Sequence, residues 1–137
     1  MWHGPSLADV LGDVSHVDAT ARPVASGHSI WELVHHLTAW TAIVQARLAP
    51  TAPTPPTSEQ DWPPVRETSA EAWRTALQAL KDAHRDLAAE VAELSDDALD
   101  KRVPGKDHTV SAMLHGLVEH DAYHGGQIAI LKRALTK

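Results

Sequence analysis

Apolar side chains recur every three or four residues along most of the chain, which is the spacing of one face of an α-helix. The clearest run lies within residues 29–48, where the apolar positions are Ile30, Leu33, Val34, Leu37, Trp40 and Val44. Ser29 and Glu32 form a capping box at the start of this run, and Pro50 follows its end. The pattern predicts a helix that begins at Ser29 and ends before Pro50.

The same spacing predicts a second long helix that begins near Thr68 or Ser69. Thr68 and Glu71 have the spacing of another capping box. The apolar positions that follow are Trp73, Leu77, Leu80, Leu87, Val91 and Leu94. Their alternating spacings of four and three are typical of a helix that packs against other helices. Ser95 is then placed to cap a short turn that continues through Leu99.

A third long helix opens at Thr109 and runs to about Ala134. Gly125 and Gly126 lie inside it, at a cost of about 1–2 kcal/mol relative to two alanines. A helix tolerates such a cost where larger side chains would block a neighbouring helix or the opening to a site. We therefore expect the glycines to allow either a close helix approach or access to a site beside them.

Residues 5–14 predict a short first helix with Ser6 as its N-cap. Residues 49–67 are rich in proline and threonine. Extended at about 3.1–3.3 Å per residue, this linker can run the length of a 20-residue helix. The helices on either side of it need not be antiparallel. Four apolar stripes thus predict an all-α protein, a four-helix bundle with one long crossover, and we expect Trp62 to fix the linker to the bundle.

The composition limits the kinds of functional site and partner that the chain can have. The 137 residues predict a single domain over 1–137, and 43% apolar residues are enough for a core. The absence of cysteine excludes disulfides, thiolate ligands and a cysteine nucleophile. A net charge of -6 without a basic cluster argues against nucleic-acid binding. No apolar run approaches a membrane span, and the N-terminus lacks a signal pattern, so we expect a cytoplasmic protein without membrane partners.

The candidate chemistry lies in the last predicted helix. His120 and His124 are four residues apart and therefore share one face. That face continues through apolar residues in both directions, namely Met113, Leu117, Ile128 and Leu131. The pair is thus expected to point into the protein, where two imidazoles can bind one metal ion. By itself the spacing also suits two core histidines that hydrogen-bond to neighbours.

A third histidine strengthens the interpretation of the pair as part of a metal site. His36 lies inside the apolar stripe, three residues after Leu33, whereas His35 falls toward its flank. We therefore favour His36 over His35 as the inward group. His84 interrupts the apolar seam of another helix, as a core histidine bonded to a neighbour or as a group beside the metal site.

His36, His120 and His124 can converge in the core of the bundle. Three neutral imidazoles suit Zn²⁺ and accept Ni²⁺ or Fe²⁺. Three protein ligands leave a coordination position open, which is typical of catalytic rather than structural sites. The chain lacks the His-Glu-x-x-His motif of zincins and has only one Glu-x-x-His where a di-iron bundle needs two.

Three polar residues can support these ligands. Asp121 is placed either to orient a ligand histidine or to make a polar contact between helices. Gln127 follows His124 by three residues and can reach the same cavity. Glu32 precedes His36 by one turn, although capping of its own helix is the simpler role.

Two motifs together give the chain a family likeness. The segments 29–37 and 120–128, with Trp2-His3-Gly4-Pro5, resemble the DinB-like, YfiT-like family of metalloenzymes over nearly the whole chain. The resemblance implies an up-down-down-up bundle with the crossover between its second and third helices. It also implies a divalent metal ion held by His36, His120 and His124.

The resemblance further implies an activity. Relatives include metal-dependent thiol S-transferases and isomerases that use a low-molecular-weight thiol, such as bacillithiol or mycothiol, and many family members are homodimers. We therefore expect a small-molecule thiol and an electrophile as partners, in a transfer, isomerisation or related hydrolysis. Two alternatives stay open from the sequence: a non-catalytic metal-binding or stress-related bundle, and a plain helical interaction domain. Whether His3 approaches the metal is also open.

Overall fold

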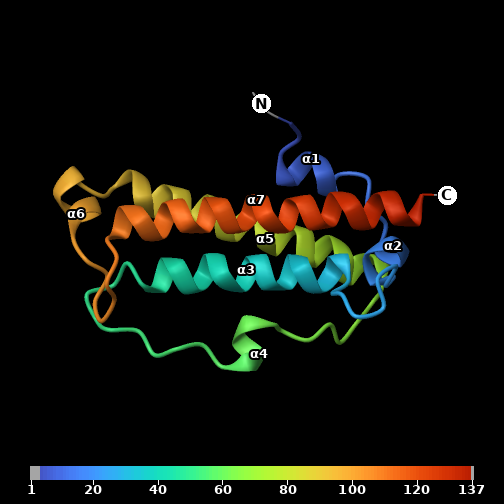
Figure 1. Cartoon of the computed structure of the whole chain (residues 1–137), viewed down its shortest axis with the longest axis horizontal. Helices are drawn as coiled ribbons and strands as arrows, with labels where there is room; N and C mark the ends of the chain where they lie inside the picture. Colours follow the sequence, from blue (N-terminus) through green and yellow to red (C-terminus); the bar gives the residue numbers. More distant parts are fainter. Residues whose placement is uncertain (1–3, 137) are drawn as a thin grey trace.

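The computed structural model describes residues 4–136, which fold into helices without a strand (Figure 1). The helices of this range are α1 (Leu7–Leu11), α2 (His16–Thr20), α3 (Ile30–Ala46), α4 (Ser58–Asp61), α5 (Ala70–Ala92), α6 (Asp96–Asp100) and α7 (Val110–Leu135). The all-α prediction is confirmed. Within residues 4–136, none of the helices combines the length and the hydropathy needed to cross a membrane.

Polar residues set where the long helices begin. The Ser29 hydroxyl accepts the backbone N–H of Glu32, and the Glu32 carboxylate accepts the N–H of Ser29, as predicted. At α5 the cap is Ser69, which accepts the N–H of Ala72. The predicted capping box of Thr68 is therefore wrong, because the helix begins one residue later. Glu71 instead lies in the first turn, where a negative charge favours the helix dipole.

The directions of the long helices follow from contacts at their ends. Near their starts, the rings of Trp31 in α3 and Trp73 in α5 lie 5.1 Å apart between centres. Near their ends, Gln45 Nε2 donates to Glu90 Oε2 at 2.9 Å. The helices α3 and α5 are thus parallel, as the long linker allows, and α7 runs in the opposite direction (Figure 1). The complete up-down-down-up order stays a prediction. The first helix is shorter than the predicted 5–14, since α1 spans Leu7–Leu11 and a separate helix α2 follows it.

Two apolar clusters form the core. The first surrounds Trp31 at the start of α3 and includes Trp73, Ile128 and residues of α1. The second lies at the other end of α3, where Val44 meets residues of α5 and α7. The linker runs along the bundle and contains α4 (Figure 1). Directly after α4, Trp62 stacks on His28 and His36 with ring centres 3.6 and 3.8 Å apart. Trp62 thus fixes the linker to the bundle, as expected.

The structure contradicts one of the two roles expected for the glycines of α7, the close approach of another helix. A Cβ built on Gly125 would meet Leu7 Cδ1 at 3.8 Å, an ordinary contact, and one on Gly126 would meet no atom of residues 4–136 within 4 Å. Neither glycine is therefore required by a close approach. In both cases the backbone is helical, where alanine is preferred.

We predict that Gly126→Ala stabilises the protein by about 0.5–1 kcal/mol, because alanine loses less backbone entropy on forming a helix. Urea unfolding measures the change. Gly105→Ala is the matched control, since Gly105 has φ +72°, and we expect it to destabilise the protein by about 1–2 kcal/mol. A loss of stability in Gly126→Ala would mean that this face of α7 is covered in solution.

Candidate metal centre

Three imidazoles from two helices meet in the middle of the bundle. One nitrogen from each of His36, His120 and His124 lies within 4.8 Å of the other two. The Nε2 atoms of His36 and His120 are 3.0 Å apart. The ring centres of His120 and His124 lie 4.5 Å apart. A tetrahedral ion with bonds of about 2.0–2.1 Å separates its ligand nitrogens by about 3.3 Å, so small ring rotations can bring all three onto one ion.

His36 is held by the linker. Its Nδ1 donates to the backbone carbonyl of Asp61 at 2.7 Å, and the Trp62 ring stacks on it nearly parallel, at 9°. The residue is only 5% exposed. Because a carbonyl can only accept, Nδ1 must carry the proton, and in a neutral ring Nε2 then has a free lone pair. The linker thus fixes the tautomer that can bind a metal.

His124 is held by its own helix. Its Nδ1 donates to Gln127 Oε1 at 2.7 Å, and the residue is 7% exposed. One turn of α7 brings the amide to the imidazole, since residues three apart are neighbours on a helix. Gln127 therefore bonds to His124 without lining the cavity beside His36 and His120. With the proton held on Nδ1, Nε2 of His124 has a free lone pair for an ion.

His120 differs from the other two ligand candidates. Its Nδ1 lies 3.8 Å from Asp121 Oδ1, too far for a hydrogen bond, and within residues 4–136 both buried atoms have no partner. The other oxygen of Asp121 accepts from His84 Nε2 at 2.8 Å. His84 therefore does not reach the metal candidates directly, but it holds the carboxylate beside one of them.

The two unpartnered atoms have a simple explanation in the tautomers. Since His36 Nε2 carries no proton, the 3.0 Å contact requires His120 Nε2 to donate, which leaves Nδ1 of His120 as a bare acceptor. That acceptor faces an oxygen of Asp121, also an acceptor. An ion on Nε2 of His120 would move the proton to Nδ1, which could then donate to Asp121. The residues therefore fit a metal ion, because both unpartnered atoms gain a hydrogen bond when Nε2 is a ligand.

The surroundings of His36 and His120 favour their neutral forms. Burial lowers the pKa of His36 below its ordinary value of 6.5, with a smaller contribution from His124, and outweighs the hydrogen bond to Asp61, which acts in the other direction. Burial, then His124 and His36, lower the pKa of His120. Neutral imidazole is the form that binds metals. The site is therefore ready for a cation at neutral pH.

A cavity of about 510 Å³ borders two of the three histidines. His36 and His120 form one part of its lining, and apolar side chains of α3 and α7 form most of the rest, namely Trp40, Val44, Met113 and Leu117. This volume is in the range of small-molecule sites. An ion on the imidazoles would thus have a neighbouring space for a ligand from solution.

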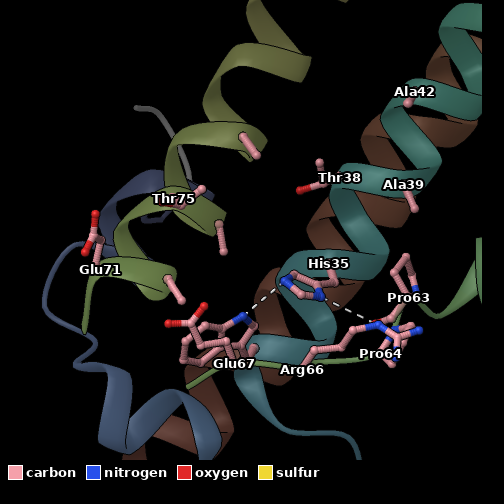
Figure 2. A pocket seen from close by; sticks show the side chains of 14 residues that line it. His35, Thr38, Ala39, Ala42, Pro63, Pro64, Arg66, Glu67, Glu71 and Thr75 are labelled. Carbon is pink, nitrogen blue, oxygen red and sulfur yellow. Dashed lines mark hydrogen bonds between the residues drawn. The ribbon is translucent and has the colours of Figure 1, made fainter. Parts of the chain in front are cut away.

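A larger groove, about 810 Å³, lies elsewhere, between α3, α5 and the linker (Figure 2). His35 faces this groove. Its Nε2 accepts from Trp31 Nε1 at 3.0 Å, and its Nδ1 lies 3.4 Å from the carbonyl of Pro63. His35 is therefore not among the three grouped histidines, as its flank position predicts. His3 lies outside the described residues.

Sequence reasoning missed several residues of this region. Asp61 supplies the carbonyl that holds His36, and its carboxylate accepts from Trp40 Nε1 at 2.7 Å. Arg47 and His108 line the cavity beside the imidazoles. In the sequence each of these residues is simply a polar residue next to a helix end. That position does not reveal where the linker or the loop before α7 will lie.

Comparison with known families gives one result. A family model described as the DinB superfamily matches residues 3–128, which is most of the chain. No curated protein and no solved structure matches it.

We predict that the metal-free protein loses stability as the pH falls below about 6.5, the pKa of an unfolded histidine. With the pKa values of His36 and His120 lowered by folding, the unfolded state binds more protons in this window, so the free energy of unfolding rises with pH there. The free energy of unfolding should be highest above the unfolded pKa. It should decrease as the pH falls from there through the lower pKa values of the folded state. Urea unfolding with a chelator measures this dependence. The double variant His36→Gln/His120→Gln should show a shallower decrease, and an unchanged decrease would contradict the assignment.

Proposed function

The chain belongs to the DinB superfamily, and on that premise we propose that it is a metal-dependent thiol S-transferase. His36, His120 and His124 would hold one divalent ion, with Zn²⁺ as the best match for three imidazoles and Ni²⁺ or Fe²⁺ as acceptable substitutes. In this proposal α1 and α2 together take the place of the first helix of an up-down-down-up bundle.

The observation that carries the proposal is the cavity beside the imidazoles. A structural ion is enclosed by protein ligands, whereas a catalytic ion keeps a position for a ligand from solution. Here three imidazoles are grouped and about 510 Å³ of space borders two of them. This arrangement favours an enzyme over a bundle that uses metal only for stability.

The residues of the chain have separate roles in this proposal. Asp61 and Gln127 fix the tautomers of His36 and His124, and Asp121 accepts from His120 when its Nε2 is a ligand. The apolar wall of α3 and α7 limits water around the reacting groups. When bound, the ion supplies the positive charge that stabilises a thiolate at neutral pH.

The thiol must come from solution, since the chain has no cysteine. In the transfer the thiol proton goes to solvent, and the sulfur forms a bond to the electrophilic carbon. The leaving group departs with the electron pair of the bond that breaks. Hydrolysis or isomerisation in the same cavity would use the same ligands with a different partner molecule.

We predict one divalent ion per chain in protein purified without an affinity tag, measured by elemental analysis. His36→Ala, His120→Ala and His124→Ala should each lose most of the metal, because two imidazoles bind it much more weakly than three. His35→Ala is the matched control and should retain it, since His35 bonds to Trp31 and Pro63 instead.

Asp121→Asn tests the role of the carboxylate in the same measurement. It keeps all three imidazoles but weakens the acceptor for His120, and we expect a loss of metal affinity of about 10–100-fold. Full metal content in all three histidine variants would rule out this metal centre.

We also predict metal-dependent conjugation of a small thiol to an electrophilic probe such as chlorodinitrobenzene, followed by absorbance. Activity should disappear with a chelator, return when Zn²⁺ is added, and be absent in His124→Ala, because the thiolate is no longer stabilised. The control is His35→Ala, which should remain active. Equal activity in metal-free and metal-loaded protein would exclude the proposed reaction.

A further inference from the structure

Arg47 is a buried arginine that forms no ion pair with a carboxylate of residues 4–136. It follows the last residue of α3, it is 9% exposed, and its Nε has no hydrogen-bond partner among residues 4–136. The ion pairs of the remaining arginines and of Lys132 do not involve it. Nε is the guanidinium nitrogen that is both fully buried and unpartnered among the described residues. A buried donor without an acceptor is unfavourable, and largely buried charges are normally paired.

The guanidinium lies on the metal side of α3. Its Cζ is 5.5 Å from the ring centre of Trp40, and that ring lies 6.0 Å from the ring of His120. Arg47 also borders a groove of about 460 Å³ under the linker, but Trp40 lines only the cavity beside the imidazoles. One apolar ring thus separates the guanidinium from the candidate ligands, inside a single cavity.

The lining of this cavity supplies no anion for Arg47. Its one carboxylate, Asp61, accepts from Trp40, lies 3.3 Å from His36 Nδ1 and forms no ion pair with Arg47. His108 is the remaining polar group outside the metal candidates, and it is half-buried. As far as the structure describes it, Arg47 is the single fixed positive charge on the lining. The missing partner is therefore expected to arrive with the ligand.

We propose that this cavity binds a small thiol that carries a carboxylate, with the carboxylate paired to Arg47 and the sulfur directed to the three imidazoles. A guanidinium forms two parallel hydrogen bonds with a carboxylate. A single fixed cation balances a singly charged carboxylate, whereas a phosphate dianion would need further donors. The carbon chain between the two ends would pack on Trp40 and the apolar wall. The thiol half of this inference rests on the proposed function, and the carboxylate half does not.

Calorimetry on the zinc-loaded full chain tests the inference with mercaptohexanoate and mercaptohexanol, which differ only in the charged end. The acid should bind the wild type at least about tenfold more tightly, as expected for a buried hydrogen bond to a charged group. In Arg47→Met the preference should vanish while the alcohol binds as before. Arg47→Lys should keep part of it, because the charge remains.

Arg66→Met is the matched control, since Arg66 is exposed and pairs with Glu59; it should keep the whole preference. The unfolding midpoint of each variant verifies its fold, and Arg47→Lys decides the question if Arg47→Met does not fold. No preference for the acid in the wild type, or an unchanged preference in Arg47→Met, would overturn the inference.

A second pair of ligands separates the two proposals. Hexanoate and hexanol lack sulfur and are titrated into metal-free protein. Binding of hexanoate that depends on Arg47, without metal-dependent binding of either thiol, would support the carboxylate site and contradict the thiol function. Metal-dependent binding of both thiols without any effect of Arg47→Met would support the function and contradict the carboxylate site.

Discussion

The hydrogen bond from His36 Nδ1 to the carbonyl of Asp61 connects the Pro-rich linker to the centre of the bundle. Because His36 is buried, its N–H needs a partner, and no residue of its own helix supplies one. The linker provides that partner and places Trp62 flat against the ring. The same segment then sets the Asp61 carboxylate against Trp40, which forms the cavity wall. This hydrogen bond therefore couples the position of the linker to the tautomer of His36 and to the shape of the cavity.

The same requirement explains why the site favours a cation. Each imidazole can direct a lone pair at a shared point only if its other nitrogen has an acceptor. His36 and His124 have such acceptors already. His120 is instead the donor between the rings, and its free nitrogen faces Asp121 across 3.8 Å. Nδ1 of His120 can donate to Asp121 only when Nε2 gives up its proton and offers its lone pair to another group, such as an ion. His84 matters here because it holds Asp121 in place at 2.8 Å.

The sequence pattern predicted those features that neighbouring residues determine, such as where a helix begins and which of its faces is buried. The apolar stripe of α3 and the cap at Ser29 give the helix its start, and the place of His36 in that stripe separates it from His35. The short helices α2 and α4 were missed, because four or five residues are too few to show a helical period. Asp61 and Arg47 were missed for another reason. Their partners depend on where the linker and the helix ends lie in three dimensions, which their sequence neighbours do not determine.

The charges around the cavity then favour one kind of ligand. The carboxylates of Asp61 and Asp121 lie near the Nδ1 atoms of His36 and His120, at 3.3 and 3.8 Å. The Nε2 atoms of His36 and His120 face each other, and Arg47 forms no ion pair with Asp61, the one carboxylate on the cavity lining. With an ion on the imidazoles, positive charge would stand at two ends of an apolar space, where the low dielectric strengthens attraction. A neutral molecule would leave both charges desolvated and unpaired. A molecule with two anionic ends and an apolar middle would pair both charges, which a thiolate with a distant carboxylate does.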